Sequence, residues 1–116
     1  MAVTIDGSAN TISGTATSAA NAIGVGQTWQ QFTVPSQRSS GSTNTNTTGR
    51  TIYVSVRLNQ DDGQISLTVN GFQIASSGTT AGPQNMWVSG IIPDGATYSV
   101  TASSNTVSTL LWYELR

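Results

Sequence analysis

The side chains in this sequence that are best suited to chemistry are those that recognise sugars. A saccharide ring is bound by an aromatic platform beneath its apolar face, with amides, hydroxyls and a planar guanidinium at its edge. Both tryptophan and asparagine also have a structural interpretation, because Trp packs well in cores and interfaces and Asn is a common turn former. On or beside two long polar stretches, we predict ligand contacts from Trp29, Arg38, Asn44, Asn46, Asn85 and Trp87.

Catalytic chemistry is restricted by the residue types that the sequence lacks. It contains no His, Cys or Lys, which excludes imidazole bases and metal ligands, thiolate nucleophiles and Schiff-base amines. A pair of carboxylates of the glycosidase type remains as an alternative. However, Asp61-Asp62-Gly63 and Pro93-Asp94-Gly95 are ordinary turn compositions. We therefore expect no enzyme activity, no metal site and no cofactor.

The composition also restricts the partners. Charged residues make up 8% of the 116 residues, against about a quarter in an average domain. Ser, Thr, Asn and Gln take their place, so we expect a surface rich in hydroxyl and amide groups. The net charge is -1 and all four cations are Arg, which gives no basic patch for nucleic acid. No apolar run approaches the roughly 18 residues of a membrane span, so we expect no membrane insertion.

The elements that would position these side chains are β-strands. Apolar residues alternate with polar ones over residues 52–58 and again over 65–69, which predicts strands with one buried face. Asn70-Gly71 is a typical pair for a type I′ hairpin turn. The stretch from Thr51 to Ser77 therefore predicts a three-stranded antiparallel meander. Its two-residue loop predicts two cross-strand pairs, Val69 with Phe72 and Leu67 with Ile74.

The whole chain predicts about eight strands separated by turn signals, with no helical periodicity. This pattern is typical of an all-β antiparallel sandwich or jelly roll, which we assign to residues 27–116. Several strands carry large apolar groups on both faces, and the second face needs a subunit or a ligand to cover it. The groups that suggest this are Tyr53, Trp87, Ile91, Leu110 and Trp112.

Residues 1–26 form a separate segment of small residues with isolated aliphatics. Short strands are expected at 3–6 and 11–13, but so few aliphatics need a partner surface. A linker and a piece of fibre in which three chains meet are both open interpretations. Glu114 and Arg116 share one side of the last strand, as either a surface pair or a subunit contact. The predicted oligomer interface comprises Ile5, Ile12, Ile23, Trp112, Glu114 and Arg116.

Four segments in the same order give the sequence a family likeness. They are IGVGQTWQ, the stretch from Arg38 to Ile52 that ends in NTTGRTI, IPDGATYSV and the final LWYELR. Together they resemble a domain at the C-terminal end of tail-fibre proteins of tailed bacteriophages and prophages, over about Ile23 to Arg116. The sequence departs from that pattern at Asn44, where the family is expected to have Tyr.

The resemblance implies a distal fibre domain, homotrimeric, that recognises a bacterial surface polysaccharide such as lipopolysaccharide or capsule. It also implies that residues 1–26 join an upstream fibre shaft, and that the protein is made in the bacterial cytoplasm and acts from the virion. The alternative is a structural trimerisation, capping or decoration domain of a fibre with no ligand of its own. A glycan-cleaving enzyme is a third hypothesis.

Overall fold

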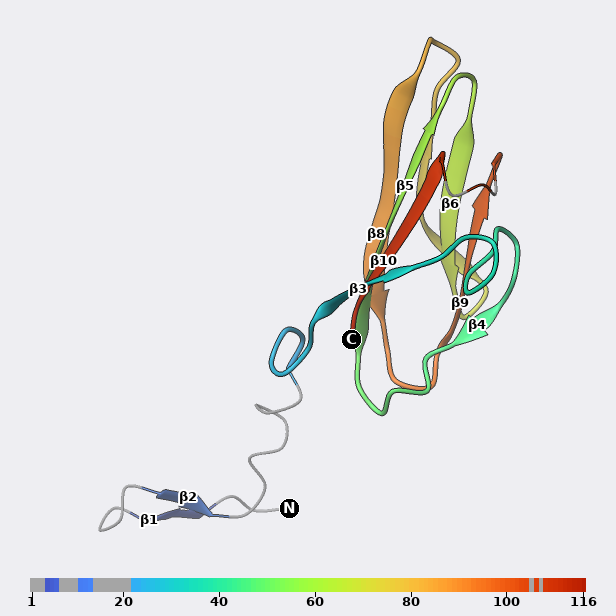
Figure 1. Ribbon diagram of the computed structural model, residues 1–116. Coiled ribbons are helices and arrows are strands. Elements are labelled where there is room, and N and C mark those ends of the chain that lie inside the picture. The colour runs from blue at the N-terminus through green and yellow to red at the C-terminus, as the bar shows by residue number, and fades with distance from the viewer. Residues whose placement is uncertain (1–3, 7–10, 14–21, 105, 107) are drawn as a thin grey trace.

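The described part of the chain is built from β-strands. The computed structural model describes residues 4–6, 11–13, 22–104, 106 and 108–116, the first two ranges as backbone alone. Within these ranges there is no helix, and so none that could span a membrane. The strands, drawn as arrows in Figure 1, are β1 Thr4–Asp6, β2 Thr11–Ser13, β3 Trp29–Phe32, β4 Asn44–Thr45, β5 Ile52–Gln60, β6 Gln64–Val69, β7 Phe72–Gly78, β8 Gln84–Ile92, β9 Thr97–Ala102 and β10 Leu110–Leu115.

Eight of these strands form two antiparallel sheets of four that pack face to face, which confirms the predicted β-sandwich. The first sheet has the order β3-β10-β5-β8, and the second has the order β4-β9-β6-β7. The chain passes between the sheets at every connection except the β6–β7 hairpin, which is the strand order of a jelly roll. The predicted strands near residues 3–6 and 11–13 are present as the separate hairpin β1–β2, in which Ile5 pairs with Ile12.

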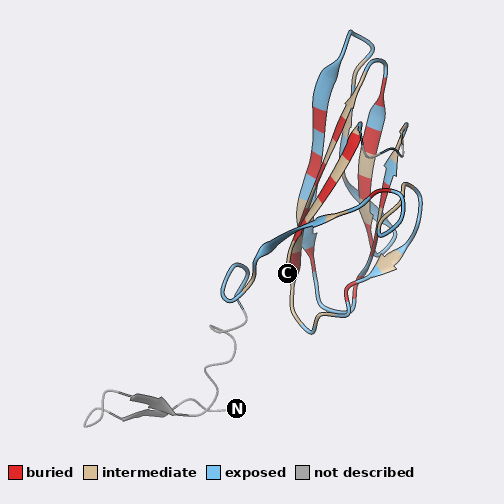
Figure 2. Cartoon of the chain, in the orientation of Figure 1, coloured by how far each residue is buried: buried red, intermediate tan, exposed pale blue. Residues whose placement is uncertain are grey.

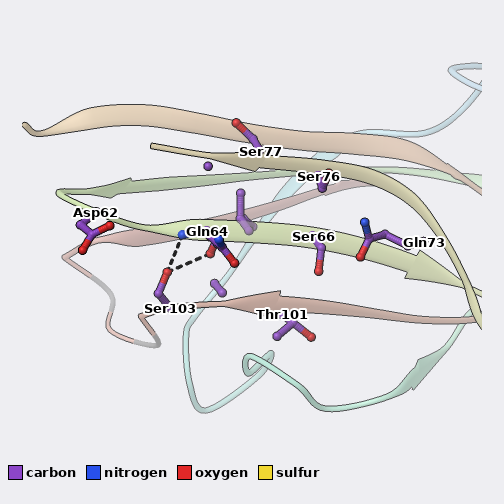
Figure 3. Close-up of a pocket in the computed structure, with 11 residues that line it drawn as sticks. Asp62, Gln64, Ser66, Gln73, Ser76, Ser77, Thr101 and Ser103 are labelled. Atoms are coloured by element: carbon purple, nitrogen blue, oxygen red, sulfur yellow. Dashed lines mark hydrogen bonds between the residues drawn. The ribbon is translucent and has the colours of Figure 1, made fainter. Parts of the chain in front are cut away.

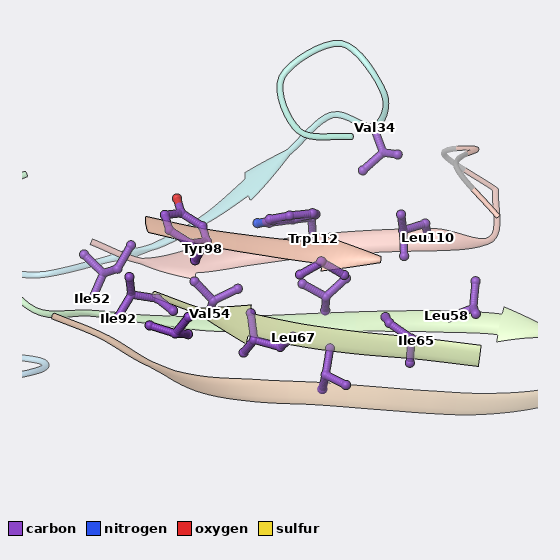
Figure 4. Packing of buried hydrophobic residues seen from close by; sticks show 14 of the residues in the cluster. Val34, Ile52, Val54, Leu58, Ile65, Leu67, Ile92, Tyr98, Leu110 and Trp112 are labelled. Atoms are coloured by element: carbon purple, nitrogen blue, oxygen red, sulfur yellow. The ribbon is translucent and has the colours of Figure 1, made fainter. Parts of the chain in front are cut away.

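The core lies between the two sheets and follows from the alternation of side chains. Along β5 every second residue is fully buried, and the intervening residues are partly exposed. Figure 2 shows similar bands of buried residues along β6, β8 and β10. Figure 4 shows side chains from both sheets meeting in one cluster, to which Trp112 contributes the largest group. Burying each large apolar side chain contributes about 1.5–3 kcal/mol.

The predicted three-stranded meander is wrong, because β5 and β6 belong to different sheets. β5 pairs with β10 and β8, whereas β6 pairs with β7 and β9. The turn at 61–63 therefore carries the chain from one sheet to the other, with Asp62 at a φ of 48°. A period-two pattern identifies the buried side of each strand. It does not distinguish neighbours in one sheet from strands that face each other across the core.

The β6–β7 hairpin is confirmed, but its register is only half as predicted. Asn70 and Gly71 have φ values of 49° and 83°, as a type I′ turn requires, and Val69 pairs with Phe72. Leu67, however, pairs with Ala75, because a bulge shifts the register after the turn. The bulge leaves the Ile74 side chain close to β8, where a Cβ on Gly90 would lie 2.6 Å from Ile74 Cδ1.

Candidate functional site

The outer side of the first sheet gathers aromatic and aliphatic side chains, and we call it the aromatic face. The register places Trp29, Leu115, Tyr53 and Ile91 in one row across the four strands. A second row near the other end of the strands holds Leu111, Arg57 and Trp87. Trp29 is 54% exposed, and Trp87 and Ile91 are each 52% exposed. Tyr53, Trp87 and Ile91 thus form the second apolar side that the sequence predicts, whereas Leu110 and Trp112, named with them, lie in the core at 1% and 0% exposure.

The two tryptophans lie at opposite corners of the aromatic face. Trp29 lies on one edge strand and Trp87 on the other, and their rows are four residues apart along β5. Strand spacing and rise place them about 20 Å apart. Trp29 packs edge-on against Tyr53 with ring centroids 5.9 Å apart, and the Arg57 guanidinium lies 6.0 Å from the Trp87 ring. The two predicted platforms therefore cannot hold the same sugar ring.

Asn85 is the one predicted polar contact that shares a surface with a predicted platform. It precedes Trp87 by two residues on β8, so both point outward, and both are exposed. Its Oδ1 accepts a hydrogen bond of 2.8 Å from Asn59 Nδ2 on the neighbouring strand. The structure thus brings Asn85 and Trp87 together at one corner of the aromatic face.

Glu114 lies inside the sandwich, where its carboxylate accepts hydrogen bonds from five donor atoms on four side chains. Arg38 donates from Nε at 2.8 Å to Oε2 and from Nη2 at 3.1 Å to Oε1. Tyr98 Oη lies 3.1 Å from both oxygens, Trp112 Nε1 donates at 2.9 Å, and Arg116 Nη1 donates at 3.0 Å. Both Glu114 and Trp112 are 0% exposed. We call these five residues the Glu114 cluster.

The Glu114 cluster overturns three predictions. Trp112 and Glu114 cannot contact another subunit, because they have no exposed surface even in the isolated chain. Arg38 is not a free ligand group, since it is paired with Glu114 and stacked 4.1 Å from the centroid of the Phe32 ring. Arg116 keeps 22% of its side chain exposed at the edge of the cluster. Glu114 and Arg116 do pair, but in the interior rather than on the surface.

The cluster also changes the acid–base behaviour of Tyr98. Burial, reinforced by the negative charge of Glu114, raises its pKa from 10.0 to about 12. The neutral phenol therefore stabilises the folded state. Its contribution is present in full below pH 10 and is lost as the pH rises through about 12.

We predict that an alkaline titration followed by phenolate absorbance will detect the raised pKa of Tyr98. Subtracting the curve of Tyr98→Phe from that of the wild type should isolate a transition near pH 12. Each curve should be recorded with a circular dichroism spectrum to confirm that the fold persists. A difference curve centred at pH 10 would show that Tyr98 is not held in the cluster.

The remaining predicted residues have varied surroundings. Asn46 is 1% exposed and donates to the carbonyl oxygens of Arg50, Ile92 and Pro93, so the prediction that it binds a ligand is wrong. Asn44 is half-buried, with Nδ2 3.4 Å from Ser42 O. Ile23 is 42% exposed. The side chains of Ile5 and Ile12 lie outside the described residues.

The outer side of the second sheet has a different chemistry, and we call it the hydroxyl face. The register places Ser76, Ser66 and Thr101 in one row across three strands, and Gln73, Thr68 and Ser99 in the next. This face forms an open groove with a volume of about 720 Å³. Figure 3 shows the residues that line it. This groove was not predicted from the sequence, although its polar residues alternate with the buried Ile65, Leu67 and Val69.

No group of three or more His, Cys, Asp or Glu residues in the described ranges is placed to hold a metal ion. The described residues form two candidate binding surfaces, the aromatic face and the hydroxyl face, on opposite sides of the sandwich. Comparison with known proteins adds no assignment, because no family model, curated protein or solved structure matches this chain.

Proposed function

We propose that this chain is a distal domain of a bacteriophage tail fibre that binds a bacterial surface glycan, either lipopolysaccharide or capsule, without cleaving it. In this proposal the domain acts from the virion during adsorption to the host. The observation that carries the proposal is the contrast between the two outer faces of one sandwich. One face is aromatic, as a subunit contact would be. The other is a groove of hydroxyl and amide groups, which suits a polyhydroxylated ligand.

Self-association through the aromatic face is part of this proposal, with a homotrimer favoured. Exposed Trp and Tyr side chains are enriched at protein interfaces and scarce on the rest of the surface. The face carries Arg57 as its charged group, so bringing two copies together desolvates few charges. Residues 1–26 would then lead to the upstream fibre shaft.

A structural cap or decoration domain without a ligand is the second candidate. The same aromatic face supports it, because a domain that only trimerises a fibre also needs a large apolar contact. The two candidates differ in the hydroxyl face, which has a role in the first and none in the second. Binding to cells therefore separates them.

The test is binding of the fluorescently labelled domain to a panel of bacterial strains, with purified surface polysaccharide as competitor. A receptor-binding module should bind a few strains saturably and be displaced by the polysaccharide of those strains. The protein must first be shown to be folded and its mass in solution recorded. Absence of binding across a broad panel would favour the structural cap.

A further inference from the structure

We propose that the groove of the hydroxyl face binds an uncharged saccharide chain and rejects anionic ones. This inference rests on the proposed function and adds to it the location of the site and the charge class of its ligand. The groove lies on the second sheet, away from the aromatic face, and is open to a volume of about 720 Å³. None of the residues that sequence analysis selected for ligand binding lines it.

The groove presents hydrogen-bonding groups that are not engaged by other described residues. The side chains of its outward residues make no hydrogen bond to any other residue that the structure describes. Hydroxyls and amides both donate and accept, as the hydroxyl groups of a sugar do. Within a row these groups are spaced by about 4.8 Å, the distance between strands. The residues concerned are Gln64, Ser66, Gln73, Ser76 and Thr101.

The groove is built on three paired strands of the second sheet. Ser103 closes one end, where its Oγ accepts from Gln64 N at 2.6 Å and donates to Gln64 O at 3.0 Å, drawn as dashed lines in Figure 3. Asp62 lies in the turn before β6, and the other lining residues belong to the paired strands β6, β7 and β9. Groups fixed on strands lose little conformational freedom when they bind.

The charge of the groove disfavours an anionic ligand. Its one ionisable lining residue is the carboxylate Asp62. Of the four Arg residues in the chain, Arg38 and Arg116 pair with Glu114, and Arg57 lies beside Trp87 on the opposite face. The fourth, Arg50, donates to the carbonyl oxygens of residues 22 and 25. A uronic acid, sialic acid or phosphate group would therefore meet a negative charge without a cation to offset it.

The hollows of the hydroxyl face favour a ligand longer than one sugar. A second hollow of about 250 Å³, lined in part by Thr68 and Ser99, continues along the same face beyond the Ser66 row. The main groove also contains no aromatic platform. Recognition must then come from several hydrogen bonds spread along a chain, which favours a polysaccharide segment over a single sugar. Each contact is weak, and several copies in an oligomer would add avidity.

The test combines loss and gain of binding on immobilised bacterial polysaccharides, grouped by composition as neutral or anionic. The wild-type domain should bind members of the neutral group. The double variant Ser66→Ala and Thr101→Val removes two neighbouring hydroxyls and should bind at least about tenfold more weakly. Thr47→Val is the matched control, because Thr47 is exposed in a loop away from the groove, and it should bind as the wild type does. Unchanged unfolding midpoints would show that the variants fold.

The gain arm is Ser66→Lys, which places a cation at the centre of the groove. It should weaken binding to the neutral polysaccharides and create measurable binding to anionic ones, at low salt above all. Wild-type binding confined to the anionic group, or full binding by the double variant, would overturn the groove proposal while leaving glycan binding intact. Wild-type binding to neither group would overturn both proposals.

Discussion

Replacing Glu114 with Ala should lower the free energy of unfolding by about 3–5 kcal/mol, the cost of breaking a buried ion pair by removing one partner. The carboxylate is 0% exposed and accepts hydrogen bonds from two guanidinium groups, a phenol and an indole. Its removal leaves the Arg38 charge half-buried without a counter-ion, and leaves buried donors on Tyr98 and Trp112 unpaired. It also opens a cavity next to the largest core side chain.

Urea unfolding at one fixed protein concentration measures this effect, because self-association would otherwise add to the apparent stability. Asp94→Ala is the matched control, since Asp94 is an exposed acid in a turn, and it should change stability by less than about 0.5 kcal/mol. The loss of stability for Glu114→Gln should lie between those of the two alanine variants. Gln keeps the shape of the side chain but places an amide donor among the donors of the cluster. A loss below 1 kcal/mol for Glu114→Ala would show that Glu114 is not a buried, fully paired carboxylate.

Replacing Trp29 or Trp87 with Ala should weaken self-association, each by at least about 30-fold. Trp is among the residue types most enriched at interface positions whose truncation costs 2 kcal/mol or more, and both side chains are more than half exposed in the single chain. Their positions at opposite corners of the aromatic face mean that the two losses should be close to additive. The double variant is therefore expected to be a single chain at micromolar concentration.

Sedimentation or light scattering over a dilution series measures the mass. Phe72→Ala is the control, because Phe72 is a 75% exposed aromatic on the second sheet rather than on the aromatic face. It should leave the mass of the assembly unchanged. A wild-type domain with the mass of one chain at micromolar concentration would instead show that the aromatic face is not a subunit contact.

The sandwich was predictable because apolar, buried residues alternate with polar, exposed ones along its strands. β5 and β6 each bury every second residue, and the Asn70-Gly71 turn fixes where one hairpin reverses. The assignment of strands to sheets was not predictable in this way. β5 finds its neighbours β8 and β10 far along the chain, and local pattern holds no information on such pairs.

The candidate site was predicted in part, and β10 shows why. β10 carries large apolar residues on both sides. Alternation places Leu111 and Tyr113 on one side of the strand, and Trp112 and Glu114 on the other. It does not indicate which of the two sides is buried. The buried Glu114 is stabilised by Arg38, 76 residues earlier in the chain, a pairing that no local spacing indicates. The groove was missed for the opposite reason, because the outward Ser, Thr and Gln residues of a strand resemble an ordinary solvated side.

The central claim is that the two faces of the sandwich have different partners, and one titration tests it most directly. A short oligosaccharide, prepared from the surface polysaccharide of a strain that the domain binds, is titrated calorimetrically into the variant carrying both Trp29→Ala and Trp87→Ala. A short ligand reports the affinity of each chain without avidity. We predict the wild-type affinity per chain, within about twofold, even where the variant no longer self-associates. Loss of binding by a folded variant would instead place the sugar on the aromatic face and contradict the account.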